Sequence, residues 1–315
     1  MSSVSNTVKR TALDRRMDRI RDLEEQGRLG TKLTNRTLRK IMSNKLAVFG
    51  AVLFVVICIL CFAAPLFTKW GPTQISLRDR MAVPSAEHIF GTDQMGRDIW
   101  SRMLYGGRIS IVVGLGSALG AALIGVTLGM FVGYKGGWLD KIILKISDVF
   151  LAFPQMVLII IMVALVGQSL QNMIIIFILT GWPSMYRMAR SKVLSLKEEE
   201  FVQALRAFGI SDFKIAFKHM FPNTVGPIVV NITLSTAMFI LQEASLSVLG
   251  YGVPQEIATW GNIINVITNA GTIRYDWLGY WWMWLPCAIM LILFVLAINF
   301  IGDGLRDASD PTQIG

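Results

Sequence analysis

The side chains that could carry chemistry in this chain are few and widely separated. Cys58 and Cys61 have the C-x-x-C spacing of redox and zinc sites, but both fall inside an apolar run, where packing is the expected role. His88 and Asp93 could begin a metal site, yet the only other histidine, His219, lies far along the chain beyond several apolar runs. A zinc site needs three or four ligands, so no metal site is predicted. No paired carboxylates or H-E-x-x-H motif in the apolar runs indicate an intramembrane enzyme.

One acidic residue interrupts an otherwise uncharged apolar run. Residues 219–255 contain no Asp, Glu, Lys or Arg apart from Glu243. An ionisable residue inside a membrane span is costly and is a functional candidate by default. Glu243 and the nearby Ser245 are therefore candidates for a pathway or an outer gate. The alternative is that water or a local hydrogen bond satisfies the carboxylate.

The composition indicates a membrane protein. The 315 residues are 53% hydrophobic and 16% charged, whereas soluble domains carry about 25% charged residues. Four further runs lack any charged residue, and roughly 20 apolar residues are enough to cross a bilayer core of about 30 Å. These runs are 46–67, 109–134, 149–186 and 277–302. Membrane lipids are therefore an expected partner.

The longest run needs two spans. As one helix, 149–186 would be about 57 Å long, and the polar stretch GQSLQN at 167–172 offers a break. The sequence therefore predicts an all-α membrane protein with six transmembrane helices over 46–315, preceded by a basic arm at 1–45. An amphipathic helix is expected at 13–30 in that arm. Because the arm is polar, no cleavable signal peptide is expected, and the first span would be retained.

The placement of lysine and arginine predicts the orientation. The segments 1–45, 135–145, 187–223 and 303–315 hold 23 of the 30 basic residues. Cytoplasmic loops are enriched in Lys and Arg. Both termini and the 187–223 loop are therefore predicted to be cytoplasmic, and the 68–108 segment is predicted to lie outside. The net charge of +9 reflects this bias and does not indicate nucleic-acid binding.

The second span is rich in regularly spaced glycines. Gly116 and Gly120, and then Gly125, Gly129 and Gly133, are four residues apart. In a helix this spacing lets another helix approach closely. Close packing against another span is therefore predicted.

The 187–223 loop contains two short amphipathic segments. The first ends at Gly209, a natural helix-ending residue, and the second is predicted to end at Pro222 before the next span. Their apolar sides consist of Phe201, Leu205 and Phe208 in the first and of Phe213, Phe217, Met220 and Phe221 in the second. Helices this short are marginal in water. They need a docking surface, either the inner face of the same chain or a groove on a partner.

This loop resembles the EAA loop of bacterial ATP-binding-cassette importer permeases, whose pattern is E-A-A-x3-G-x9-I-x-L-P. Ala204, Gly209 and Pro222 match, whereas Gln203 replaces the acid and Leu205 replaces the second alanine. The resemblance implies that this segment couples the membrane subunit to an ATPase. The coupling residues that it implies are Phe201, Gln203, Ala204, Leu205, Arg206, Ala207, Phe208, Gly209 and Pro222.

A second stretch resembles the dipeptide and oligopeptide branch of these permeases. Residues 88–111, HIFGTDQMGRDIWSRMLYGGRISI, follow its external signature, H-x-x-G-T-D-x-x-G-R-D-x-x-S-R-x-x-x-G-x-R-x-S, and the resemblance extends in order over 45–311. Thr92 or Asp93 is predicted to cap a short helix whose apolar residues at 99–104 lie at the membrane interface. The signature residues proposed as an external site are His88, Gly91, Thr92, Asp93, Gly96, Arg97 and Asp98.

The resemblance implies a type I importer permease fold that forms half of a pore in a bacterial cytoplasmic membrane. It also implies the partners, namely a homologous second permease subunit, two cytoplasmic ATP-binding subunits and an external substrate-binding protein. The chain has no G-x-x-x-x-G-K-[ST] phosphate loop. The chain is therefore not expected to be an enzyme or to hold a cofactor, and the partner ATPases would bind ATP and Mg²⁺. The implied mechanism is alternating access, with residues 201–221 moved by the ATPases.

The substrate is expected to be a di- or oligopeptide. Related importers of nickel, glutathione or opines remain alternatives, because selectivity in this branch rests largely on the external protein. An ATP-independent secondary transporter is the alternative from a different class. Such a transporter would need intramembrane ionisable groups for ion coupling, and only Glu243 lies deep in a predicted span.

Overall fold

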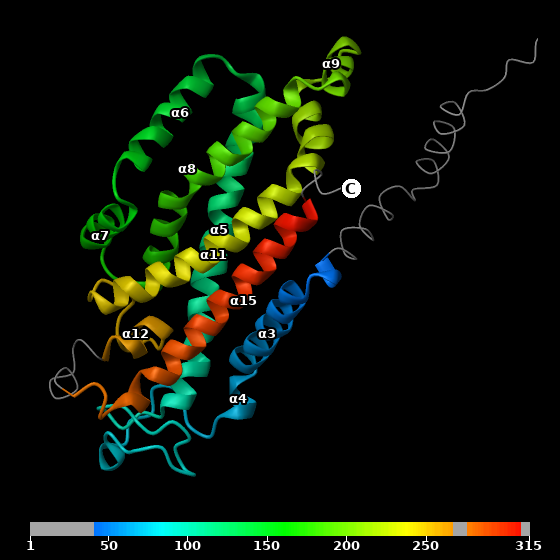
Figure 1. Cartoon of the computed structure of the whole chain (residues 1–315). Coiled ribbons are helices and arrows are strands. Elements are labelled where there is room, and N and C mark those ends of the chain that lie inside the picture. Colours follow the sequence, from blue (N-terminus) through cyan, green and yellow to red (C-terminus); the bar gives the residue numbers. More distant parts are fainter. Residues whose placement is uncertain (1–40, 267–275, 310–315) are drawn as a thin grey trace, which may run out of the picture.

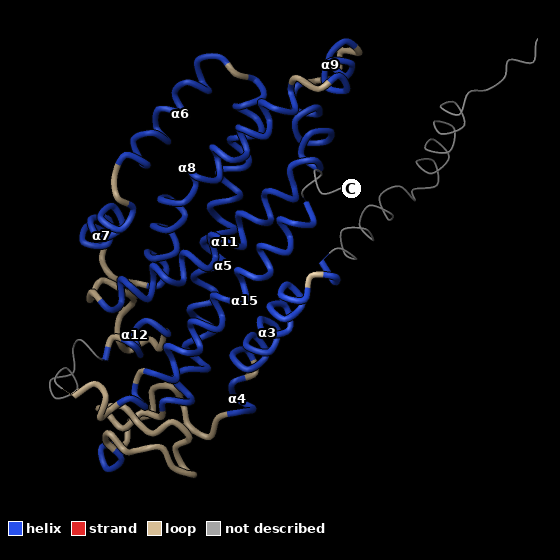
Figure 2. Tube along the Cα trace, in the orientation of Figure 1, coloured by secondary structure: helices blue, strands red, loops and turns tan. Residues whose placement is uncertain are grey.

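The structure, a computed structural model, describes residues 41–266 and 276–309. These residues are mostly helical and include no strand (Figure 2). The helix predicted at 13–30 lies outside the described residues. The elements are α3 (Lys45–Phe62), α4 (Ala64–Phe67), η1 (Leu77–Asp79), α5 (Ile99–Lys135), α6 (Gly137–Ala152), α7 (Gln155–Val166), α8 (Leu170–Lys197), α9 (Glu200–Ala207), α10 (Asp212–Lys214), η2 (Ile215–Met220), α11 (Phe221–Val248), α12 (Trp260–Ile264), η3 (Trp281–Met283) and α15 (Leu285–Ser309).

The long helices pack side by side into one bundle (Figure 1). α5 contacts α8, α11 and α3, and α15 packs between α3 and α11. The start of α3 and the end of α15 are joined by a hydrogen bond from Asn44 Nδ2 to Asp307 Oδ2, 3.3 Å long. α9 lies at one end of the bundle, and α12 with the 68–98 segment lies at the other. The two candidate sites are therefore at opposite ends.

The number of spans agrees only in part with the prediction of six. Within residues 41–266 and 276–309, four helices are long and apolar enough to cross a membrane: α3, α5, a continuous helix at 212–248, and α15. The pair α6 and α7 would make a fifth, but its halves are bent by 92°. α8 covers the predicted fourth span and has 28 residues, yet it does not meet the same test of length and apolarity. Its second half carries basic residues, which lower its hydropathy.

The predicted third span is broken at a proline. Phe153 has an extended backbone with φ −95° and ψ 144°, and Pro154 follows it before α7 begins at Gln155. Proline has no N–H to donate, and it disfavours helical geometry in the residue before it. One straight helix across 149–166 is therefore excluded.

The glycine pattern of α5 packs closely against α8, as predicted. A Cβ on Gly125 would lie 2.5 Å from the Trp182 carbonyl oxygen, and a Cβ on Gly129 would lie 2.7 Å from Ala189 Cβ. Gly116 differs, because a Cβ there would meet nothing within 4 Å. Glycine is thus required at the α5–α8 contact and not along the whole helix.

Gly125→Ala is expected to destabilise the protein by about 2 kcal/mol, because the new methyl group clashes with backbone atoms of α8 that cannot rotate away. Gly116→Ala is the matched control and is expected to be neutral. Thermal denaturation of the purified protein in detergent compares the two. Equal midpoints for both variants would contradict the close contact.

The helix α5 begins a few residues after the predicted caps and has a different cap. Its N-cap is Asp98, whose carboxylate accepts from the Ser101 N–H at 2.7 Å. The predicted caps, Thr92 and Asp93, lie in the preceding loop, so that prediction is wrong. Residues 99–104 form the first turns of a 37-residue helix, and most of their apolar side chains are buried in the bundle. The expected separate interfacial helix does not form.

Candidate functional site

The helix α9 ends in the glycine turn that the sequence predicts. Gly209 has a φ of +71°, in the left-handed region that favours glycine. Its N–H donates to the Arg206 carbonyl (2.9 Å), and the Ile210 N–H donates to the Leu205 carbonyl (3.2 Å). These are the two bonds of a Schellman motif. The turn fixes the direction in which the chain leaves α9.

α9 has one side against the bundle and one side exposed. Val202 is fully buried and Leu205 is half-buried in the same inner apolar cluster, whereas Phe201 and Phe208 are 41% and 82% exposed. The predicted common apolar side of Phe201, Leu205 and Phe208 is therefore wrong. The segment has two apolar sides, one with Val202 and Leu205 and one with Phe201 and Phe208. The spacing of apolar residues does not indicate which side packs against the bundle. The other exposed residues of α9 are Glu200, Gln203, Ala204, Arg206 and Ala207.

The second short helix runs directly into the next span. α10, the π-helical turn η2 and α11 form one continuous helix, and Pro222 sits in the first turn of α11. The prediction that Pro222 ends the helix is thus wrong. A proline ring clashes with the usual partner carbonyl four residues back, and a π turn shifts that pairing by one residue. η2 lets the helix pass through the proline.

The C-terminal ends of α5 and α8 meet α9 around Tyr134. Lys197 Nζ donates to the Tyr134 carbonyl at 3.0 Å, and its ammonium lies 5.6 Å from the ring centroid. The Arg206 guanidinium lies 5.9 Å from the same ring. Cations at such distances are attracted to the ring face. A basic residue of α9 is therefore tied to the bundle while its phenylalanines stay exposed.

A buried carboxylate that the sequence analysis missed joins α6 to α8. Asp140 accepts from Arg190 Nε (2.7 Å) and Nη2 (2.6 Å), and from the Tyr186 hydroxyl (3.0 Å). A bidentate pair of this kind has a fixed geometry. The signal available in the sequence was an acid in the first turn of an amphipathic helix. Its partners lie about 50 residues away, and spacing alone does not find them.

The external signature forms one polar network before α5. His88 Nδ1 and Asp98 Oδ2 are 2.9 Å apart, and Trp70 stacks on the histidine ring with centroids 5.2 Å apart. Asp93 accepts from Arg97 Nε at 2.6 Å and from two backbone N–H groups. Asp98 therefore both caps α5 and holds His88. No cluster of three potential metal ligands occurs among the described residues.

The glycines of the signature are required by close backbone contacts. Gly91 and Gly96 have φ values of +66° and +71°. A Cβ on Gly91 would lie 2.4 Å from the Ala82 carbonyl oxygen, and a Cβ on Gly96 would lie 1.8 Å from that of Ser76. Thr92 Oγ1 donates to the Asp79 carbonyl between them. The glycines of the motif thus have a structural role in folding this loop.

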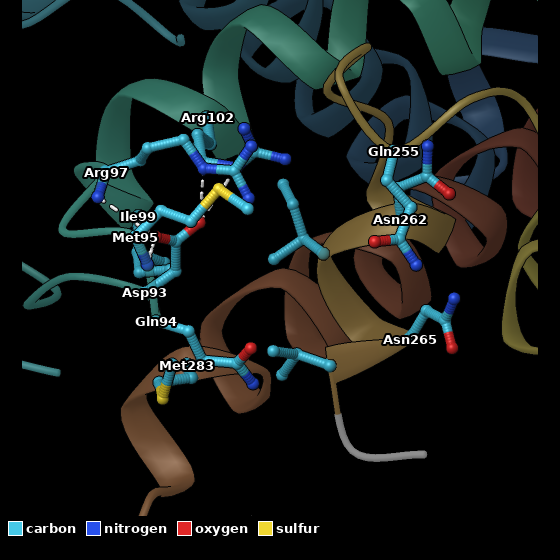
Figure 3. Close-up of a pocket in the computed structure, with 12 residues that line it drawn as sticks. Asp93, Gln94, Met95, Arg97, Ile99, Arg102, Gln255, Asn262, Asn265 and Met283 are labelled. Carbon is cyan, nitrogen blue, oxygen red and sulfur yellow. Dashed lines mark hydrogen bonds and ion pairs between the residues drawn. The ribbon is translucent and has the colours of Figure 1, made fainter. Parts of the chain in front are cut away.

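A polar cavity of about 100 Å³ opens beside this network (Figure 3). Asp93, Arg97 and Arg102 lie on one side of it, and Gln255 and Asn262 lie on the other. Arg102 is 3% exposed, and its Nε is 3.7 Å from Asp93 Oδ2. The structure therefore brings Asp93 and Arg97 of the predicted external site to a cavity. His88 instead pairs with Asp98, away from it.

Glu243 is fully buried at the far end of α11. Its Oε1 accepts from Ser247 (3.0 Å) and Thr259 (2.8 Å), and its Oε2 lies 3.4 Å from Ser110 Oγ. Thr259 is the N-cap of α12, and Ser110 belongs to α5. The carboxylate thus joins α11 to α5 and α12. The sequence alone suggested only a local hydrogen bond as the alternative to a pathway role. Ser245 is half-buried, and its hydroxyl donates to a carbonyl one turn back in α11.

The chain matches two family models. The model described as binding-protein-dependent transport system inner membrane component matches residues 125–314. The model described as the N-terminal transmembrane domain of oligopeptide transport permease C matches residues 32–84.

Curated relatives match most of the chain. The dipeptide transport system permease protein DppC of Alkalihalophilus pseudofirmus is 40% identical over 273 residues, which is 87% of this chain and 88% of the relative. The oligopeptide transport system permease protein OppC of Bacillus subtilis is 36% identical over 290 residues, 92% of this chain and 93% of the relative. With the helical bundle and the EAA-like loop, these matches show that the chain belongs to the family of binding-protein-dependent transport system inner membrane components.

Proposed function

We propose that this chain is one of the two membrane subunits of an ATP-driven importer, and that it moves di- or oligopeptides by alternating access. The family and the apolar helices establish a multi-pass inner-membrane permease subunit, not an enzyme. The proposal rests on one observation above the others. The exposed side of α9 is joined through the Gly209 turn to a continuous helix that ends beside the buried Glu243.

The partners that this proposal requires are the homologous second permease, two cytoplasmic ATP-binding subunits and an external substrate-binding protein. Three exposed apolar residues, Phe201, Ala204 and Phe208, are spaced three and four residues apart and form a stripe along α9. This is the pattern by which a helix docks in an apolar groove. In this proposal the groove belongs to an ATPase subunit. ATP and Mg²⁺ are bound there and not in this chain.

The continuous helix provides the mechanical connection. Its 37 residues form a helix about 55 Å long. This is longer than the thickness of a bilayer with both headgroup layers, about 40–45 Å. When the ATPases close, α9 moves with them, and the helix carries that motion to the outer end. For the motion to change the populations of the inward- and outward-open states, contacts at that end must differ between the two states. A contact of equal strength in both would not shift the equilibrium between them. Glu243 is proposed to act at this outer gate, where it joins α11, α5 and α12.

The proposed topology has six spans with both termini in the cytoplasm. α6 with α7 and α8 then supply the third and fourth spans. The 68–108 segment lies outside, so the cavity beside Asp93 and Arg102 faces the external protein. The excess of basic residues near α9 supports this orientation.

The proposed substrate follows the names of the relatives, which are dipeptide and oligopeptide permeases. Nickel, glutathione and opines remain alternatives within the same importer type. An ATP-independent secondary transporter is the alternative of a different class.

Reconstitution tests the proposal. The chain is co-expressed with the second permease, the ATPases and the binding protein of the same importer, and the purified complex is placed in vesicles. Peptide uptake is expected only with ATP and Mg²⁺ on the ATPase side. Uptake that persists without ATP, or without any ATPase subunit, would contradict the importer assignment.

A further inference from the structure

A second cavity, of about 200 Å³, lies at the break between α6 and α7. Its polar lining comes from three elements: Gln155 of α7, Thr180 and Ser184 of α8, and Ser235 and Gln242 of α11. The remaining lining residues are apolar or glycine, and none of the lining side chains carries a charge. The cavity is therefore mostly apolar, with a few polar groups and no charge.

The cavity lies midway along α8 and in the second half of α11. Thr180 and Ser184 are about 15–21 Å from the start of α8, at 1.5 Å per residue, and Ser235 and Gln242 are about 21–32 Å from the start of α11. Non-helical backbone at membrane depth is tolerated where it is buried in protein or lines a hydrated space. The break at Phe153 is such a segment, because Phe153 is 56% exposed and lines the cavity.

The two glutamines form an incomplete amide pair. Gln242 Nε2 donates to Gln155 Oε1 at 2.9 Å. Gln242 Oε1 is buried without a partner, and in the described part of the chain Gln155 Nε2 makes no hydrogen bond. The pair therefore has one unused acceptor and unused N–H donors. If the oxygen and nitrogen positions of both amides are exchanged, the pair still has one hydrogen bond, one unused acceptor and unused donors.

The unused acceptor and the unused donors of this pair together complement a peptide group, which offers one N–H and one C=O. We infer that Gln155 and Gln242 bind a backbone amide of the peptide during its passage. This inference rests on the proposed function of peptide import. Because no charge lines the cavity, binding to the backbone does not depend on the charge of the peptide's side chains. An unsatisfied buried amide is costly, so a substrate that completes the pair is favoured.

The test compares a peptide with its ester analogue. Vesicles containing the full complex take up tri-alanine or the same molecule with both peptide bonds replaced by esters, which lack the N–H. The wild type is expected to prefer the amide. In Gln242→Met the amide-to-ester ratio is expected to fall by about tenfold, the value of one buried hydrogen bond. The external binding protein is the same in both measurements, so its own preference cancels.

Leu158→Met is the matched control, since it alters the same cavity without an amide, and it is expected to keep the wild-type ratio. Gln242→Leu replaces Gln242→Met if that variant fails to co-purify with the ATPases, because the ester lacks the N–H that the Gln242 oxygen would accept. A wild-type ratio in the Gln242 variants, or no amide preference in the wild type, would overturn the inference and leave peptide import standing. Absence of any ATP-driven tripeptide uptake by the wild type would overturn both.

Discussion

Replacing Gly209 with proline is expected to abolish ATP-driven uptake while leaving the protein in the membrane. Proline cannot adopt the φ of +71° found there, and it lacks the N–H that donates to the Arg206 carbonyl. Forcing a proline into a helix end of this kind costs about 3 kcal/mol, so the properly oriented α9 should be populated roughly 100-fold less. Uptake and ATP hydrolysis are measured on the same vesicles.

The informative result is the separation of the two activities. Hydrolysis should continue at or above its basal rate, because the ATP sites belong to other subunits. Gly209→Asn is the matched control, since asparagine tolerates left-handed geometry and a Cβ at this position meets nothing within 4 Å. It should retain uptake within a few-fold of the wild type. Normal uptake by Gly209→Pro would show that the turn does not transmit the motion.

Replacing Glu243 with alanine is expected to destabilise the outer end of the bundle by about 2–4 kcal/mol. The change leaves the hydroxyls of Ser247 and Thr259 without their acceptor in a buried site, and it creates a cavity between three helices. The loss should appear as a lower thermal midpoint in detergent. Thr259, the N-cap of α12, would also lose its bond to α11. The end of α11 next to α12 should therefore become more accessible to proteases.

Glu243→Gln separates the shape of the side chain from its charge. Glutamine keeps an oxygen for Ser247 and Thr259 and adds a donor for Ser110, so we expect most of the stability to remain. If its uptake rate and substrate range also match the wild type, Glu243 has a structural role and is not a pathway residue. Equal stability of the alanine and wild-type proteins would contradict the joining of three helices.

The turn at Gly209 and the close packing of α5 were predictable because each rests on a local rule. A glycine after a short amphipathic segment indicates a left-handed C-cap, and glycines four residues apart indicate close helix packing. Both rules depend only on neighbouring residues. The exposed position of Phe208 was not predictable, because the sequence shows two apolar sides on α9 and does not say which one is reserved for another protein.

Other features depend on residues that are distant in sequence. Asp140 meets Arg190 only after α6 and α8 pack together, and Glu243 meets Ser110 only after α5 and α11 do. The helix continues through Pro222 because a π turn precedes it. The sequence has a simple rule that proline breaks a helix, but no equally simple rule that predicts a π turn. The bend at Pro154 follows that proline rule, but its size does not.

The most direct measurement is a cross-link between α9 and the ATPase. Ala207 is exposed on α9, and cysteine at this position would lie beside Phe208 in the proposed groove. The native Cys61 and Cys287 are buried, and Leu77, 70% exposed at the opposite end, provides a control position for a second cysteine variant. With single cysteines placed along the ATPase groove, Ala207→Cys is predicted to form a disulfide-linked adduct that stops uptake until a reductant is added. Leu77→Cys should form none. No adduct from position 207, or an equal one from position 77, would contradict coupling through α9.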